Sequence, residues 1–93
     1  MLLIMDSELK SGKFSYMIKT TINFDNVESF FIERIEDPDV NNKYKVIAET
    51  GTSSYELYKG NHIDEARYIY NKILESWNSN EKIVHLDTLL NKE

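Results

Sequence analysis

The chain has 93 residues and a formal net charge of −5 at neutral pH. A chain of this length accommodates one hydrophobic core, and its 41% apolar content indicates a folded rather than a disordered protein. The acidic balance argues against a nucleic-acid binder, because such proteins neutralise phosphates with a basic stripe. The only basic concentration is formed by Lys10, Lys13 and Lys19, and it is small.

The sequence contains no cysteine, which excludes disulfide bonds and thiolate metal sites and fits a cytoplasmic protein. The apolar run Met1–Met5 lacks a basic segment before it and a small-residue cleavage site after it, so we expect no signal peptide. No apolar run approaches the roughly 20 residues that a membrane span needs. We therefore expect no membrane contact.

We expect residues 1–13 to form an N-terminal extension, as a short strand or loose tail followed by a linker. The single domain is then expected over residues 14–93. Its first element is a strand, because Phe14, Tyr16 and Ile18 recur at every second position.

The segment Val27–Glu36 carries the strongest strand signal. Phe30 and Ile32 lie on one face of this strand, and Phe31 and Ile35 lie on the other. A strand with one solvated face would alternate more cleanly between apolar and polar residues. We therefore expect both faces of this strand to be covered.

Two further strands are expected over residues 43–49 and 54–59, joined by a short loop. Strict alternation places Leu57 toward the helix that follows. The same alternation places Ile47 and Tyr58 on the opposite face of the sheet.

Residues 62–78 are predicted as an amphipathic helix, with Asn61 opening an imperfect capping box at its start. Its apolar stripe, at about 100° per residue, consists of Ile63, Ala66, Tyr70, Ile73, Leu74 and Trp77. Tyr68 and Ser76 fall on the polar side and Ile69 at the edge of the stripe. We expect the stripe to pack on the sheet.

After the helix we favour a short terminal strand over residues 82–86, followed by a last turn. The alternative is one helix over residues 81–91, because Ile83, Leu86 and Leu90 also recur at helical spacing. The element order indicates an α+β fold, in which one C-terminal helix packs on an antiparallel meander of four to five strands.

Four short segments consist mainly of the turn, cap and strand residues of these elements: Ile22–Val27, Tyr55–Leu57 before Gly60, Asp64–Ala66 and Lys82–Asp87. In these pieces the chain, over about residues 17–87, resembles small uncharacterised bacterial and phage proteins with a β-meander, one helix and a last strand. Some such meanders look like pleckstrin-homology-type sheets. The resemblance implies a binding or assembly module and supplies no catalytic residues.

Motifs for catalysis or metal binding are incomplete. The acidic loop that starts at Asp37 opens like a calcium-binding loop, but its sixth and twelfth positions hold Asn42 and Ala48 instead of glycine and glutamate. His62 and His85 lack the spacing of a helical zinc pair, and the sequence has no serine-nucleophile motif. We assign no catalytic, cofactor-binding or metal-ligating residue.

One helix covers one face of a sheet, so the opposite face needs another cover. We place Phe31, Ile35, Ile47 and Tyr58 on that face as the candidate interaction residues. Its cover could be a curled sheet, residues 1–5 or a second copy of the chain. We therefore expect a non-enzymatic interaction module that forms a homo-oligomer or docks a protein partner.

Two alternatives stay open. The acidic cluster within Glu33–Asp39 favours a phage-type decoy or inhibitor that binds a basic protein surface. A small enzyme is the third hypothesis, and it requires a deep pocket in which His62 or His85 converges with carboxylates.

Overall fold

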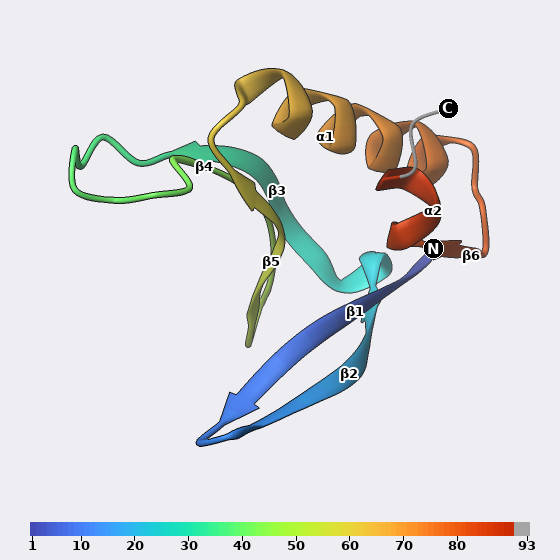
Figure 1. Ribbon diagram of the computed structural model, residues 1–93. Coiled ribbons are helices and arrows are strands. Elements are labelled where there is room, and N and C mark those ends of the chain that lie inside the picture. Colours follow the sequence, from blue (N-terminus) through green and yellow to red (C-terminus); the bar gives the residue numbers. More distant parts are fainter. Residues whose placement is uncertain (91–93) are drawn as a thin grey trace.

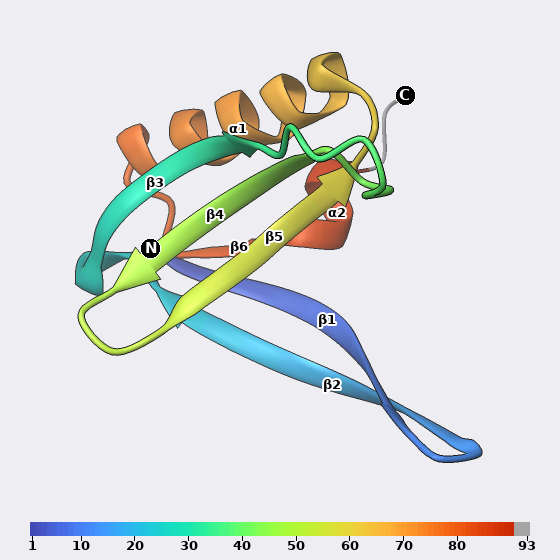
Figure 2. The same cartoon turned by 90° about the vertical axis from the view of Figure 1, so that its left-hand side faces the viewer.

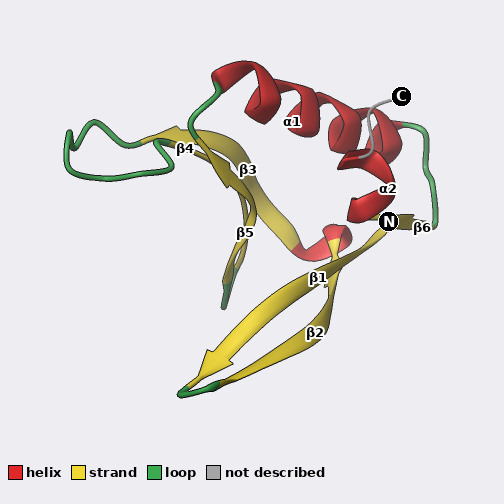
Figure 3. Cartoon of the chain, in the orientation of Figure 1, coloured by secondary structure: helices red, strands yellow, loops and turns green. Residues whose placement is uncertain are grey.

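The structure is a computed structural model, and it describes residues 1–90 of the chain (Figure 1). Within this range the elements are, in order, β1 (Leu2–Ser11), β2 (Phe14–Asn23), the 3₁₀ helix η1 (Phe24–Asn26), β3 (Val27–Arg34), β4 (Tyr44–Thr50), β5 (Ser54–Gly60), α1 (Ile63–Asn78), β6 (Ile83–His85) and α2 (Leu86–Leu90). Figure 3 shows α1 packed over the strands, which confirms the predicted α+β class.

The strands form two three-stranded sheets instead of one continuous meander. The strand orders are β2-β1-β6 and β3-β4-β5. Neighbouring strands are antiparallel throughout the second sheet, whereas β6 runs parallel to β1 in the first. A parallel pair needs a long crossover connection, and here everything between β1 and β6 serves as that connection. Alternation within a segment does not reveal which distant segment lies beside it.

Residues 1–13, which we expected to be an extension outside the domain, instead form β1 and the start of a hairpin turn. β1 pairs with β2 along its whole length, and the side chain of Leu3 is fully buried in the core. Residues 6–11 are mostly polar, so the apolar pattern ends before the strand does. Pairing with β2 needs only the backbone groups of these residues.

The core lies where the base of the β1–β2 hairpin, the inner face of the β3–β5 sheet and α1 meet. Its buried members are Leu3, Ile22, Phe24, Val46, Ala48, Leu57, Ala66, Ile69, Ile73, Val84 and Leu86. The ring centroid of Phe24 lies 5.7 Å from that of Phe30 and 5.0 Å from that of Trp77, and both pairs have edge-to-face geometry. Phe30 in turn stacks on Tyr70 of α1 at 4.6 Å. This aromatic cluster joins η1, the second sheet and α1.

The buried stripe of α1 is rotated from its predicted position. Its buried residues are Ala66, Ile69, Ile73 and Ser76. Ser76 is buried and Tyr68 is half-buried against the core, so our placement of both on the polar side is wrong. α1 contacts α2 as well as β3, β4 and β5, and a helix with two packing partners buries a wider arc than one sheet alone would cover.

The predicted capping box at the start of α1 does not form. The N-cap residue is His62, which makes no side-chain capping hydrogen bond among the described residues. The side-chain oxygen of Asn61 instead accepts hydrogen bonds from the backbone N–H groups of Asn42, at 2.8 Å, and Lys43, at 3.2 Å. Asn61 therefore ties the loop before β4 to the start of the helix.

The predicted terminal strand is present as β6, followed by the short helix α2. β6 pairs with Leu2–Ile4 of β1, so the alternative of one helix from residue 81 is wrong over residues 83–85. The last residue of that alternative, Asn91, lies outside the described part of the chain.

Candidate interaction surfaces

The outer face of the second sheet, meaning the face turned away from α1, carries a small apolar group. Phe31 lies opposite Ile47 in the strand register; Phe31 and Ile35 are half-buried and Ile47 is 7% exposed. Beside them Lys45 and Glu56 form an ion pair at 2.7 Å, and the hydrogen bond to Glu56 raises the pKa of Lys45. The outer face is therefore less open than we expected.

Tyr58 lies on the helix side of the sheet, not on the outer face. A β-bulge at Leu57 shifts the alternation by one residue, so that Tyr58 stands opposite the core residue Val46. The hydroxyl of Tyr58 donates to a carboxylate oxygen of Glu65 in α1 at 2.7 Å. Burial, together with this bond, raises the pKa of Tyr58 to about 12. A side chain at Gly60 would overlap the Tyr58 hydroxyl, so the glycine leaves room for the ring.

The β1–β2 hairpin extends beyond the core as an arm, which we define as residues 5–20. β6 supports β1 only along Leu2–Ile4, so the arm has two strands. Figures 1 and 2 show it projecting away from the rest of the chain. At its tip Gly12 has a φ of 60° in the first position of a two-residue turn, as in a type II′ hairpin.

Large apolar side chains of the arm are exposed. The exposed fractions are 67% for Phe14, 52% for Tyr16, 71% for Met17 and 41% for Ile18. Strand alternation places Phe14, Tyr16 and Ile18 on the same face of the hairpin as the buried Ile22. It places Met17 on the opposite face. Contiguous exposed apolar surface typically marks an interaction site. The alternation of these residues was visible in the sequence, but their exposure was not.

The arm is also the basic part of an acidic chain. The arm contains three lysines, one aspartate and one glutamate, so its formal charge is +1. Since the whole chain carries −5, subtraction leaves −6 for the other residues. Residues 25–60, which include the second sheet, hold eight acidic and four basic side chains, a net charge of −4. The arm and the second sheet therefore have opposite charge.

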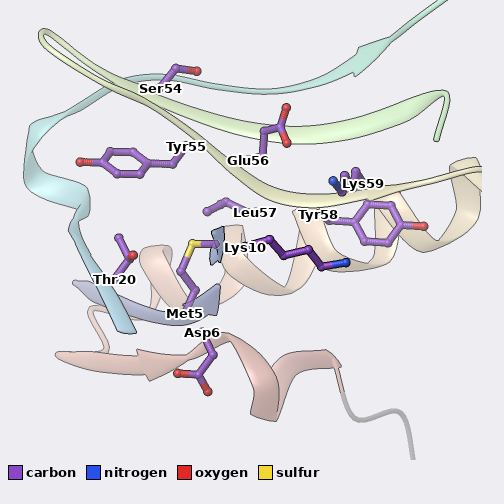
Figure 4. Close-up of a pocket in the computed structure, with 10 residues that line it drawn as sticks. All are labelled: Met5, Asp6, Lys10, Thr20, Ser54, Tyr55, Glu56, Leu57, Tyr58 and Lys59. Carbon is purple, nitrogen blue, oxygen red and sulfur yellow. The ribbon is translucent and has the colours of Figure 1, made fainter. Parts of the chain in front are cut away.

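A cleft of about 900 Å³ separates the arm from β5 (Figure 4). Its walls are formed by Met5, Asp6, Lys10 and Thr20 on the arm side and by Ser54–Lys59 on the β5 side. In Figure 4 the side chains of Met5 and Leu57 point toward each other, whereas Asp6 points away. Within residues 1–90, β5 is the last strand of its sheet and no strand pairs with its outer edge. The cleft therefore borders a free strand edge.

The titratable side chains that line the cleft belong to aspartate, glutamate, lysine and tyrosine residues. Neither His62 nor His85 is among its described lining residues, and Asp6 hydrogen-bonds to Asp87, raising the pKa of that α2 carboxyl. In the described part of the chain no three metal-ligating side chains gather at one place. Nor does any helix over those residues have the length and apolarity to cross a membrane.

Comparisons of the chain with protein-family models, with curated proteins and with solved structures find no match. The resemblance to bacterial and phage meander proteins therefore stays a prediction. Function is therefore inferred from the surfaces of this chain alone.

Proposed function

We propose that this protein is a non-enzymatic interaction module of the cytoplasm that docks another protein chain through its arm. The observation that carries the proposal is the exposure of Phe14, Tyr16 and Ile18 on one face of a projecting hairpin. The cytoplasmic location rests on the absence of cysteine.

The arm supports docking better than the outer face does. Phe14 is 67% exposed, whereas Ile47 is 7% exposed and flanked by the Lys45–Glu56 ion pair. Burying a large apolar side chain contributes about 1.5–3 kcal/mol, so a partner that covers the arm gains most of its affinity there. Phe31 and Ile35 supply a smaller secondary contact.

The proposal is tested by capture from cells that express both a tagged and an untagged copy of the chain. Wild-type protein is compared with a variant in which Phe14, Tyr16 and Ile18 are all replaced by serine, and retained proteins, the untagged copy included, are identified by mass spectrometry. We expect at least one protein to be retained by the wild type and lost by the arm variant.

The matched control is Ile83→Ser, which removes an exposed apolar side chain of β6, 57% exposed, away from the arm. This control should retain the same proteins as the wild type. Identical retention by the wild type, the control and the arm variant would contradict the proposal.

The acidic segment Glu33–Asp39 supports a second candidate function, a decoy for a basic protein surface. The side chains of Glu33, Glu36 and Asp39 are exposed, and charge in such positions is available to a basic partner. A Glu33→Gln and Glu36→Gln double variant should then bind its partner more weakly. Binding that stays constant as salt is raised would count against the decoy, because exposed charges are screened.

A further inference from the structure

We propose that the occupant of the cleft is the arm of a second copy, so that in a symmetric dimer the cleft of each copy binds the arm of the other. In each half of this dimer the arm of one copy lies along β5 of the other. The inference rests on the proposed function and names its partner.

The first support is that both β2 and β5 are edge strands. β2 and β5 each form the last strand of a sheet over residues 1–90, and all positions of Ser54–Lys59 line the cleft. An extended segment joins an exposed edge by backbone hydrogen bonds, and its alternate side chains enter the adjoining pocket. The β2 strand of a second copy has the extended conformation and the alternating apolar side chains that this mode requires.

The second support is the marginal stability of the arm. A two-stranded hairpin is marginal in water, and a third strand or a packed element is needed for a stable unit. In the described chain β6 pairs only with Leu2–Ile4 of β1, so no third strand pairs with the arm. Pairing with β5 of a second copy would supply this strand and would cover Tyr16 and Ile18.

The third support is charge, which also separates this arrangement from the simplest alternative. Pairing β2 with β2 of another copy would bring together two arms that each carry a charge of +1. Pairing β2 with β5 instead places the arm against a strand with one acidic and one basic side chain, within the segment 25–60 that has a net charge of −4. Complementary charge favours the second arrangement and disfavours the first.

Two-fold symmetry closes the assembly. If the arm of one copy contacts β5 of the other, symmetry makes the second arm contact the first β5, and the outer edges of β2 and β5 are used in both copies. A closed pair of this kind leaves neither β2 nor β5 open for further addition of strands, which is the hazard of exposed edges.

The first experiment measures the association of the purified full chain by sedimentation equilibrium. We expect a dimer, and we expect Tyr16→Lys to raise its dissociation constant about tenfold or more, because a desolvated aromatic side chain is lost from the contact. Ile83→Lys, at an exposed apolar position outside the arm, should leave the dissociation constant within about twofold of the wild-type value.

The second experiment identifies which surfaces meet. Because the chain has no cysteine, Met17→Cys on the arm and Ser54→Cys on β5 can be introduced in separate chains and joined by a bismaleimide. A mixture of the two variants should give a cross-linked heterodimer, identified by mass. Met17→Cys alone should give little cross-linked product.

The outcomes separate the inference from the proposed function. A strictly monomeric purified protein, a dimer unaffected by Tyr16→Lys, or cross-linking of Met17→Cys to itself in place of the mixed product would overturn the inference. The proposed function survives the first of these results if capture still shows a protein lost with the arm. It fails if the arm substitutions change neither self-association nor capture.

Discussion

The two halves of the β1–β2 hairpin have the same local structure and opposite surroundings. At its base Leu3 pairs with Ile22, and both side chains are buried in the core. Toward the tip Tyr16 and Phe14 continue the same alternation on β2, yet more than half of each side chain is exposed. The difference lies in which other elements cover the apolar face of the hairpin. The base packs against β6 and α2, whereas the arm, apart from Met5 and Asp6 at its start, extends past them.

This contrast teaches that an apolar alternation predicts a strand but not its burial. Burial requires a second layer, and that layer comes from segments far away in the sequence, such as Val84 and Leu86 at the C-terminal end. Substitutions in the base should therefore affect the stability of the fold far more than substitutions in the arm.

The largest effect is expected at the base. Phe24→Ala removes a fully buried ring that contacts Phe30 and Trp77, and it should lower the free energy of unfolding by about 3–5 kcal/mol. Since domains of this kind have about 5–15 kcal/mol in total, the variant should be close to unfolding. Urea denaturation followed by tryptophan fluorescence measures the change. A loss below about 1 kcal/mol would show that the aromatic cluster is not central.

At the tip of the arm, Gly12→Ala should destabilise the hairpin by about 1–2 kcal/mol, because residue 12 has a positive φ that an L side chain rarely adopts. Open space surrounds this position, so the strain is confined to the backbone of residue 12. Hydrogen exchange should show faster exchange in the arm and unchanged protection in the core. The control is Lys13→Ala at the second turn position, which should have little effect, and equal behaviour of the two variants would contradict the prediction.

A smaller effect is expected from Tyr58→Phe, which removes the hydrogen bond to Glu65 and should cost about 0.5–1.5 kcal/mol at neutral pH. The pKa of Tyr58 is raised to about 12 in the folded chain, above the value of about 10 for an unfolded tyrosine. Its stabilising effect is therefore complete below pH 10 and lost as the pH rises toward 12. Denaturation of both proteins at pH 8 and pH 11.5 should show the difference between them shrinking; a constant difference would refute this account.

The smallest effect on folding is expected from Tyr16→Ser, studied at protein concentrations low enough to keep the chain monomeric. The residue is 52% exposed, so the free energy of unfolding should change by less than about 0.5 kcal/mol. Ile22→Ala, on the same ribbon face but fully covered, should cost about 2–5 kcal/mol. Similar values for the two variants would remove the distinction between base and arm.

Sequence reasoning located most of the elements and one part of the candidate surface. Val27–Arg34, Tyr44–Thr50 and Ser54–Gly60 form where strands were expected, and α1 covers nearly the predicted residues. Phe31 and Ile47 are cross-strand neighbours, as alternation implied. Tyr58 was misplaced, because a bulge at Leu57 depends on how β5 meets β4 and leaves no local signature.

By itself the sequence determined where the chain is helical and where it is extended, because side-chain periodicity and turn residues act over a few neighbouring positions. It also set the opposite charges of the arm and the second sheet. Only the tertiary structure decided that the strands form two sheets, that β6 lies parallel to β1 and that the arm is left uncovered. These features depend on contacts between residues far apart in the sequence, and such contacts are selected by the packing of the whole chain rather than by any local pattern.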